Sequence, residues 1–280
     1  MVPRESRVID PWRVETVADF YKEAWDDADA HASGRLRGVS TGFPRLDGAL
    51  SGLHDVTVLG GLPGIGKTTL AFQIGWQAAE QGAAVIYVSA EMHAADLRAR
   101  LVAMLRAQSG AAAKREFKSV GRRVAILDGP SASVEDAKKE MAALKKQVRS
   151  KRGLVVIDSL QALALARRTH RRERDEMKGV IDREMAQVRE TAHKGGFAAL
   201  VISHMPKGTQ GRVEQFTFSG SGGIDYGADV TALLVADEGE EEGATRVGRR
   251  VEFLKNRFGS LASLRFTFYP AEHRYEELSP

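Results

Sequence analysis

The segment GLPGIGKT, residues 61–68, constrains the fold of this chain more than any other feature of its sequence. It follows the apolar run 56–59, which predicts a buried strand, and it precedes a helical pattern at residues 69–81. A glycine, four further residues and then Gly-Lys-Thr is the P-loop spacing, and a strand before it and a helix after it are the context that makes this spacing specific. The sequence therefore predicts a strand, a phosphate-binding loop and a helix in succession.

The chemistry of this loop follows from its residue types. Glycines let backbone N–H groups face bound phosphates, and the helix N-terminus adds partial positive charge. Lys67 is expected to reach the β- and γ-phosphates, and Thr68 offers a hydroxyl to Mg²⁺. We therefore expect ATP or GTP to bind here. The candidate nucleotide-binding residues are Gly61, Pro63, Gly64, Gly66, Lys67, Thr68 and Thr69.

Apolar runs alternate with helix-like segments along the rest of the chain. The predicted strands before residue 220 are residues 56–59, 85–89, 124–127, 154–157 and 199–203. This order is typical of a parallel sheet that helices cover on both faces. Further short strands are predicted at residues 230–235, 251–255 and 264–268. The sequence thus predicts an α/β fold with a mostly parallel twisted sheet, flanked by helices, and antiparallel C-terminal edge strands.

The composition limits the class of protein. With 280 residues, 43% of them hydrophobic, the chain can bury a full core, and we expect a domain at residues 37–280 after a helical arm or linker at residues 1–36. The absence of cysteine excludes disulfides, thiolate metal sites and cysteine nucleophiles. No apolar run is long enough for a bilayer and no secretory leader is visible, so we expect a cytoplasmic protein without a membrane partner. The net charge of +4 permits a polyanionic partner without requiring one.

Two acidic residues are placed to act on a bound nucleotide. Asp158 ends the apolar run 154–157, which is the Walker B pattern, and with Thr68 it forms the candidate Mg²⁺ site. A buried strand that ends in aspartate at a turn is the alternative. Glu91 follows the run 85–89 at the same predicted edge, where a residue that orients attacking water must lie. A solvated glutamate that caps the next helix is the alternative for Glu91.

Several segments, in sequence order, resemble the RecA-type ATPase domain of the DnaB family of hexameric replicative helicases. They are residues 38–69, Ser89-Ala90-Glu91-Met92, Ile157-Asp158-Ser159-Leu160-Gln161, Ile202-Ser203-His204, Ser221-Gly222-Gly223-Ile224 with Ala228-Asp229, and Lys255-Asn256-Arg257-Phe258-Gly259. The resemblance extends from about residue 38 to residue 278. It implies a RecA-type P-loop NTPase core that hydrolyses ATP with Mg²⁺.

The resemblance also implies roles around the phosphates. Lys67 and Thr68 would hold phosphate and metal, Glu91 would polarise the attacking water, and Asp158 would complete the metal shell. His204 stands where the family has a γ-phosphate sensor, usually Gln in bacterial members and His in some phage ring helicases. A buried histidine bonded to a backbone carbonyl is the alternative for His204.

Lys255 and Arg257 resemble the basic pair that reaches the neighbouring subunit's nucleotide, an arginine finger supplied in trans. The resemblance then implies a homo-oligomer, a hexameric ring, in which a monomer is a poor ATPase, and a replication or loader protein as a partner. Two alternating charges on an exposed edge strand are the alternative for this pair.

Two loops are expected, by the same resemblance, to contact single-stranded DNA in the ring's central channel. One follows Asp158 and includes the basic run 167–174, and the other spans residues 205–226. The candidate phosphate contacts are Arg167, Arg168, Arg171 and Arg172 in the first loop and Lys207 and Arg212 in the second. A solvated helix start is the alternative for the basic run. Ser219 departs from the family, which commonly has an arginine near the DNA there.

The N-terminal segment is a second departure. DnaB proteins carry a helical collar domain and a linker helix before the ATPase, and we expect only the linker in this chain. Residues 8–30 would form the helix that docks on the adjacent subunit. Its expected anchors are the aromatic residues Trp12, Phe20, Tyr21 and Trp25. Packing of these aromatics on their own domain is the alternative.

Two classes of function follow. The first is an ATP-driven DNA helicase or translocase of the DnaB-like type, which assembles as a ring on single-stranded DNA and hydrolyses ATP at subunit interfaces. The second is a RecA-type regulatory or recombination-mediator ATPase without unwinding activity. The Lys255/Arg257 pair favours the first class, whereas the missing collar and Ser219 favour the second.

Overall fold

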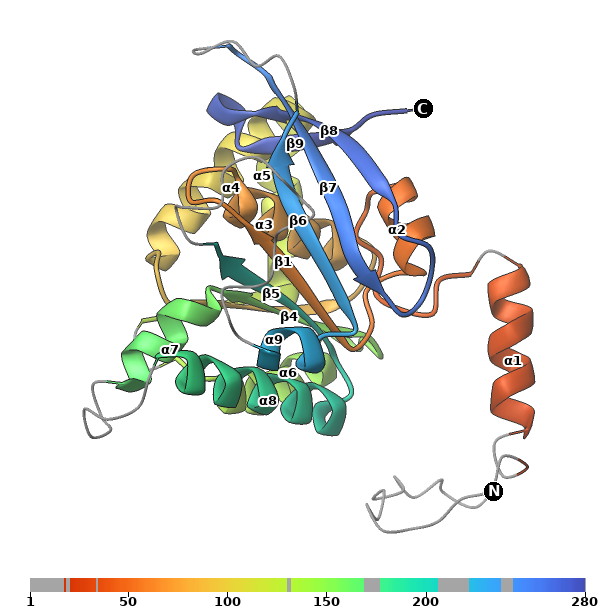
Figure 1. The fold of residues 1–280 in the computed structure, drawn as a ribbon. Coiled ribbons are helices and arrows are strands. Elements are labelled where there is room, and N and C mark those ends of the chain that lie inside the picture. The colour runs from red at the N-terminus through yellow and green to blue at the C-terminus, as the bar shows by residue number, and fades with distance from the viewer. Residues whose placement is uncertain are drawn as a thin grey trace.

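A computed structural model gives the fold of residues 18, 21–33, 35–129, 132–168, 177–205, 222–237 and 244–279 (Figure 1). These residues form a nine-stranded sheet in the order β3-β2-β4-β5-β1-β6-β7-β8-β9. Strands β3, β2, β4, β5, β1 and β6 run parallel. Strands β7, β8 and β9 continue the sheet beyond β6 as antiparallel neighbours. The predicted α/β fold with antiparallel C-terminal strands is therefore confirmed.

Every strand expected from an apolar run is present. The parallel strands are β1 (Val56–Gly61), β2 (Ala84–Ser89), β3 (Val124–Asp128), β4 (Gly153–Asp158), β5 (Ala198–His204) and β6 (Val230–Ala236). The antiparallel strands are β7 (Val247–Asn256), β8 (Ser263–Tyr269) and β9 (Arg274–Glu277). All residues of β1, β2 and β4 are buried, as the near-continuous apolar runs of central parallel strands require.

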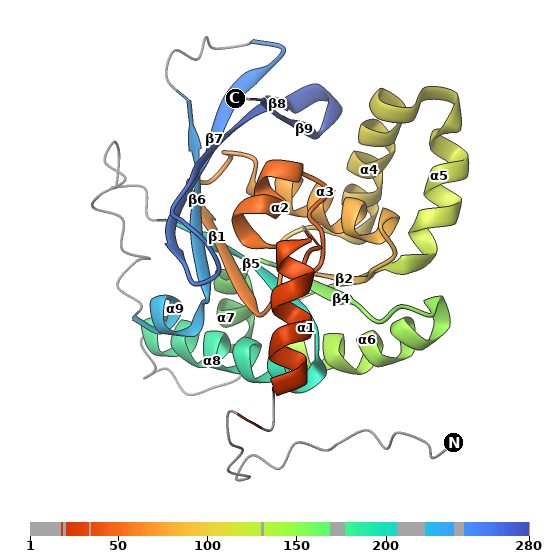
Figure 2. The same ribbon diagram turned by 90° about the vertical axis from the view of Figure 1, so that its right-hand side faces the viewer.

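Helices cover both faces of the sheet (Figure 2). One face carries α2 (Pro44–Leu50), α3 (Lys67–Glu80), α4 (Ala94–Ser109) and α5 (Ala113–Val120), and the other carries α6 (Val134–Val148), α7 (Leu160–Arg168), α8 (Met177–Gly195) and α9 (Gly222–Gly227). Side chains that alternate along a strand enter opposite layers, so Val85 packs in the α3 layer and Ile86 in the α6 layer.

Helix α1 (Tyr21–Ala32) carries part of the expected N-terminal arm. Tyr21 and Trp25 are 66% and 56% exposed, and their rings contact each other edge to face at 6.0 Å between centroids. These two rings are therefore not packed on their own domain, while Trp12 and Phe20 lie outside the described residues. None of the helices in the described segments has the length and apolar character that crossing a membrane demands.

Candidate functional site

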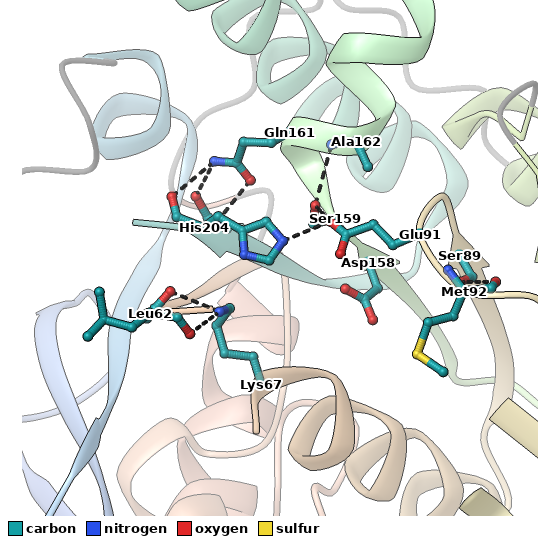
Figure 3. A network of polar contacts seen from close by, with 12 residues as sticks. Leu62, Lys67, Ser89, Glu91, Met92, Asp158, Ser159, Gln161, Ala162 and His204 are labelled. Atoms are coloured by element: carbon teal, nitrogen blue, oxygen red, sulfur yellow. Dashed lines mark hydrogen bonds and ion pairs between the residues drawn. The ribbon is translucent and has the colours of Figure 1, made fainter. Parts of the chain in front are cut away.

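The carboxyl ends of four adjacent parallel strands form the candidate site. In the sheet, Ser89 at the end of β2 is opposite Asp158 at the end of β4, and His204 at the end of β5 is opposite Gly61 at the end of β1. Glu91 follows β2 by two residues, and the predicted phosphate loop follows β1. The structure thus brings together the side chains that the sequence analysis selected at strand ends (Figure 3).

The loop between β1 and α3 has the backbone that the P-loop spacing predicts. Gly66 has a φ of +108°, and a Cβ at this position would lie 2.1 Å from the Tyr275 hydroxyl, so only glycine fits. Helix α3 begins at the next residue, which places the helix N-terminus at the loop. Pro63 and Gly64 are exposed, and Thr69 is buried in the first turn of α3.

Lys67 is a buried cation held by the loop itself. Its Nζ donates hydrogen bonds of 2.8 Å to the carbonyl oxygens of Gly61 and Leu62 (Figure 3). Burial lowers the pKa of Lys67 to about 8, although the nearby carboxylates of Asp158 and Glu91 act in the opposite direction. The ammonium group therefore lies between the loop and the acidic residues at the strand ends.

Asp158 has a carboxylate oxygen available in a buried setting. The residue is 1% exposed, and Tyr87 donates a hydrogen bond of 2.7 Å from its hydroxyl to Asp158 Oδ2. Burial raises the pKa of Asp158, while hydrogen bonding by Tyr87 and Thr68 counteracts the rise. Its Oδ1 is buried and has no hydrogen-bond partner among the described residues. A carboxylate oxygen with free acceptor capacity near a threonine hydroxyl is the donor set that Mg²⁺ prefers.

Glu91, His204 and Ser159 form one hydrogen-bonded group. His204 Nε2 lies 2.7 Å from Glu91 Oε1, and the same oxygen accepts a hydrogen bond from the Ser159 hydroxyl (Figure 3). Because a carboxylate only accepts, the His204 Nε2–H is the donor. The hydrogen bond from His204 is the main reason that the pKa of Glu91 is lowered.

Two alternatives for these residues are wrong. Helix α4 begins at Ala94, and the carboxylate that caps it is that of Asp128, which accepts from the Ala94 N–H at 2.8 Å. Glu91 is therefore not a helix cap. The His204 imidazole bonds to a carboxylate and not to a backbone carbonyl. Its Nδ1 is buried and has no hydrogen-bond partner among the residues that the structure describes.

Gln161 connects the site to helix α7, a role that the sequence analysis did not assign. Its Oε1 accepts from the His204 backbone N–H at 2.9 Å, and its Nε2 donates to the Ser203 hydroxyl at 2.8 Å and to the His204 carbonyl at 3.3 Å (Figure 3). Gln161 lies in the first turn of α7, directly after β4. The end of β5 and the start of α7 are therefore held together.

Lys255 and Arg257 lie at the opposite ends of the parallel strands, where β1 and β6 begin. Lys255 Nζ donates hydrogen bonds of 2.6 Å to the carbonyl oxygens of Asp225 and Ala228. Arg257 pairs with Asp229 at 2.6 Å, and the main chain of Asp229 bonds to Val56, the first residue of β1. The phosphate loop follows the last residue of β1, so this pair does not reach the phosphate loop of the same chain.

The position of this pair in the sheet does not by itself exclude the alternative of charges on an exposed edge strand. Strand β7 lies between β6 and β8, but its pairing with β8 ends at Glu252, so Lys255 pairs with β6 alone. Arg257 follows directly after β7. The bonds of Lys255 to two carbonyl oxygens and of Arg257 to Asp229 show that the two side chains are engaged and not merely solvated.

The residues expected to contact DNA are mostly outside the described part of the chain. Arg167 and Arg168 are the last residues of α7, so the run begins at a helix end and not at a helix start. Arg171, Arg172, Lys207 and Arg212 lie outside the described residues, as does Ser219. Their contacts with nucleic acid stay predictions.

Comparisons with known proteins agree with this geometry. The family model described as DnaB-like helicase C terminal domain matches residues 38–277. The replicative DNA helicase DnaB of Leifsonia xyli subsp. xyli is 24% identical over 276 residues, which cover 91% of this chain and 59% of the relative. The DNA repair protein RadA of Mycobacterium tuberculosis is 27% identical over 243 residues, which cover 83% of this chain and 41% of the relative.

A solved structure of a DnaB-like replicative helicase, described together with its interactions with primase, has the same fold. It superposes with a TM-score of 0.76 at 18% identity, covering 95% of this chain and 68% of the other. The chain spans less than two thirds of the length of the two sequence relatives, so it corresponds to one part of each of them.

Proposed function

This chain belongs to the DnaB-like helicase C-terminal domain family, and from that premise we propose that it is an ATP-driven DNA helicase or translocase. It would assemble as a ring on single-stranded DNA and hydrolyse ATP at the interfaces between subunits. The observation that carries this proposal is the placement of the phosphate loop and the Lys255/Arg257 pair at opposite edges of the same sheet. Each subunit would then contribute its phosphate loop to one nucleotide site and its Lys255/Arg257 pair to another.

Nucleotide binding is the first step of the proposed mechanism. The N–H groups of the loop and of the first turn of α3 would bind the phosphates, and Lys67 would exchange its bonds to the Gly61 and Leu62 carbonyls for the β- and γ-phosphates. Asp158 and Thr68 would hold Mg²⁺, for which the free Asp158 Oδ1 supplies a ligand atom. The ion, when bound, neutralises charge on the β- and γ-phosphates.

Glu91 is proposed to activate the attacking water. Its carboxylate would accept a proton from the water while the oxygen attacks the γ-phosphorus and the bond to the bridging oxygen of ADP breaks. The lowered pKa of Glu91 keeps it ionised near neutral pH, and the hydrogen bonds from His204 and Ser159 fix its direction. His204 would also sense the γ-phosphate from the end of β5.

Arg257 and Lys255 of the neighbouring subunit are proposed to complete the site. A guanidinium group supplied in trans stabilises the charge that develops on the transferred phosphoryl group. Arg257 is half-exposed and is held by Asp229, so it can be presented to a neighbour without being buried in its own subunit. Hydrolysis would then require assembly.

Movement on DNA is proposed to begin at Gln161. The residue holds the start of α7 to the end of β5. The basic run of one loop expected to bind DNA begins at the end of α7, and the other loop follows β5. A change at the γ-phosphate that displaces His204 would therefore be transmitted to both loops. Their basic residues, from Arg167 to Arg212, would bind the DNA backbone through its phosphates.

Helix α1 is proposed to dock on the adjacent subunit. Its exposed Tyr21 and Trp25 form a contiguous aromatic pair, and aromatic side chains of this size are typical anchors of interfaces. Removing residues 1–34 should then lower the assembled mass in light scattering, and an unchanged mass would exclude this role.

A second candidate function has its own support. The similarity to RadA, a DNA repair protein, covers 83% of the chain. A RecA-type regulatory or recombination-mediator ATPase would use the same interfacial site to control assembly on DNA, and it would not unwind a duplex.

Steady-state ATP hydrolysis tests the proposal. The rate should be measured over a range of protein concentrations, with and without single-stranded DNA, and strand separation should be measured on a forked duplex. A motor requires a rate per subunit that rises with protein concentration and with DNA, together with strand separation or displacement of a bound protein. A rate that rises with protein but ignores DNA would contradict the motor and favour the regulatory ATPase.

A further inference from the structure

Arg249 is a buried arginine that contacts the phosphate loop from the antiparallel strands. It lies in β7, is only 8% exposed, and donates from Nε to the carbonyl oxygen of Ile65 at 3.0 Å. Ile65 is the residue before Gly66 in the loop. The Tyr275 hydroxyl, from β9, donates to the same carbonyl at 3.4 Å. Two side chains from the antiparallel strands therefore hold one carbonyl of the loop.

The direction of this carbonyl determines the direction of a phosphate-binding donor. A trans peptide is planar, so the C=O of one residue and the N–H of the next point in opposite directions. Holding the Ile65 carbonyl toward β7 and β9 therefore directs the Gly66 N–H away from them, toward the concave side of the loop. In P-loops, the backbone N–H groups on that side bind the phosphates.

The support for Arg249 is rigid. Its guanidinium group lies over the Phe268 ring, 5.9 Å from the centroid, and Phe268 stacks on Tyr275 at 4.5 Å. Gln73 of α3 fixes Tyr275 in turn, because its amide group donates to the Tyr275 carbonyl at 2.9 Å and accepts from the Tyr275 N–H at 2.6 Å. The phosphate loop, the helix that follows it and the C-terminal strands form one hydrogen-bonded unit.

Burial of a guanidinium group has a cost that this position must offset. Removal from water lowers the pKa of Arg249, and its hydrogen bonds to the carbonyl oxygens of Ile65 and Gly248 offset part of the cost of burial. Arg250, the next residue, shows the contrast, since it pairs with Asp237 and Glu252 on the other face of β7. Of these two neighbouring arginines, Arg249 bonds to the loop.

We propose that Arg249 is a positioning residue for the nucleotide phosphates, and that it acts through the Ile65 carbonyl to orient the Gly66 N–H. The inference rests on the proposed binding of nucleotide by this loop. It also gives β7 a second role, because the strand that ends beside Arg257 begins beside the subunit's own phosphate loop. The C-terminal strands thereby connect each subunit's nucleotide to the pair offered to its neighbour.

The test is nucleotide affinity in Arg249→Gln, measured on the full chain with fluorescent ADP and ATP analogues and by steady-state kinetics. Loss of a buried charged hydrogen bond that orients one donor should raise the Kd for both nucleotides about tenfold. KM should rise by a similar factor while kcat stays within about twofold, because the β-phosphate is bound equally in the ground and transition states. Arg249→Lys, which keeps a donor, should stay within about threefold of the unaltered protein.

A matched variant and an alternative variant make the result decisive. Arg250→Gln removes a neighbouring charge that faces away from the loop, and its Kd should not change. If Arg249→Gln lowers kcat in proportion to the unfolded fraction and leaves KM and Kd unchanged, the residue is only structural and the inference is wrong. If Arg249→Gln does not fold, Tyr275→Phe removes the second donor, and its Kd should rise about threefold. An unchanged Kd in Tyr275→Phe would then overturn the inference.

The outcome is separate from the proposed function. An unaltered protein that binds no nucleotide would refute the nucleotide site itself. Binding by the unaltered protein with equal binding by Arg249→Gln would refute only the positioning role.

Discussion

Lys67 and Arg257 lie at opposite edges of the central sheet within one subunit. Lys67 Nζ bonds to the carbonyl of Gly61, where β1 ends, and Arg257 pairs with Asp229, whose main chain bonds to Val56, where β1 begins. The 6 residues of β1 span about 20 Å at about 3.3 Å per residue. The proposal that both act in one hydrolysis reaction therefore requires that they come from different subunits.

This separation predicts complementation between inactive variants. Arg257→Ala should retain nucleotide binding and lose about a thousandfold in turnover, because an arginine supplied in trans acts on the transition state. Lys67→Ala should lose binding and turnover. A mixture of the two should regain ATPase activity, because some interfaces combine an intact phosphate loop with an intact Arg257. The readout is the steady-state rate of the mixture against the sum of the separate rates.

The control for complementation uses two changes on the same side of the interface. Lys67→Ala mixed with Glu91→Gln should stay inactive, since every site then contains one of the two defects. Recovery in this control, or no recovery in the first mixture, would contradict the assignment of Arg257 to the neighbour's site.

Glu91→Gln should separate binding from chemistry. The amide retains an oxygen that can accept from Ser159 and His204, so nucleotide affinity should change little, while kcat should fall about 10²- to 10⁴-fold with the loss of the general base. Asp96→Asn, an exposed change in the first turn of α4, is the matched control. A Glu91→Gln variant that turned over ATP at the normal rate would assign water activation to another residue.

The pH dependence follows from the same carboxylate. The pKa of Glu91 is lowered below its ordinary value of 4.5, so the group is ionised above that value and loses its charge only as the pH falls through the lowered pKa. The kcat of the unaltered protein should therefore show no loss attributable to Glu91 between pH 5 and 8. An acidic limb near pH 6 that vanished in Glu91→Gln, with the residual rate normalised, would contradict this assignment.

The central fold was predictable because its signals are local. Strands β1 and β4 are apolar along their length since both faces are buried, and the loop after β1 has a spacing that only a strand-to-helix turn satisfies. Helix α2 was not predicted, because its 7 residues are too few for a periodic pattern. It depends on Asp47, whose carboxylate accepts from the Thr41 N–H at 2.7 Å and hydroxyl at 2.8 Å. Strand β9 was missed because it is a polar edge strand in which only Tyr275 is fully buried.

The site was predictable to the same extent and for the same reason. Asp158 and His204 end their strands and Glu91 follows its strand by two residues, so their proximity follows from the strand order. The hydrogen bonds that these side chains and the phosphate loop receive do not follow from the strand order. Tyr87 bonds to Asp158 across 71 residues of sequence, and Arg249 bonds to Ile65 across 184. Neither pair leaves a periodic or short-range pattern, because each partner lies on a different strand or loop that only the folded sheet brings near.

Lys67 predicts that nucleotide affinity depends on pH above neutrality. Its pKa of about 8 in the folded chain would be raised by bound phosphate, so the complex would bind more protons than the free protein. Affinity for ADP should therefore fall as the pH rises through about 8, and binding at pH 8.5 should take up protons. Calorimetric titration in buffers of different ionisation enthalpy measures the uptake. Lys67→Arg, if it binds ADP, should show no such dependence in this range, since arginine stays charged. Equal affinity of the unaltered protein at pH 7 and 9 would exclude a titrating Lys67.

The end of α3 predicts a separate effect of pH on stability. Trp76 Nε1 donates to Glu80 Oε1 at 2.9 Å and to Glu116 Oε1 at 3.3 Å, which places two carboxyl groups together between α3 and α5. Burial, followed by the hydrogen bond and charge of Glu116, raises the pKa of Glu80 to about 7 from an ordinary value of 4.5. The folded state then binds more protons than the unfolded state between these values. Its stabilising effect is complete below about pH 4.5 and is lost as the pH rises through about 7.

Glu80→Gln should remove this loss, because the amide carries no charge at any pH. At pH 8 its Tm should exceed that of the unaltered protein by about 1–3 °C, a small shift because part of the Glu80 side chain remains in water. At pH 5 the two Tm values should converge, since Glu80 is then largely protonated. Glu140→Gln removes the same charge from a solvent-exposed position of α6, and its Tm difference should not vary with pH in this way. Thermal unfolding followed by circular dichroism at several pH values measures both variants. Equal pH profiles for Glu80→Gln and Glu140→Gln would mean that the pKa of Glu80 is not raised in the folded state.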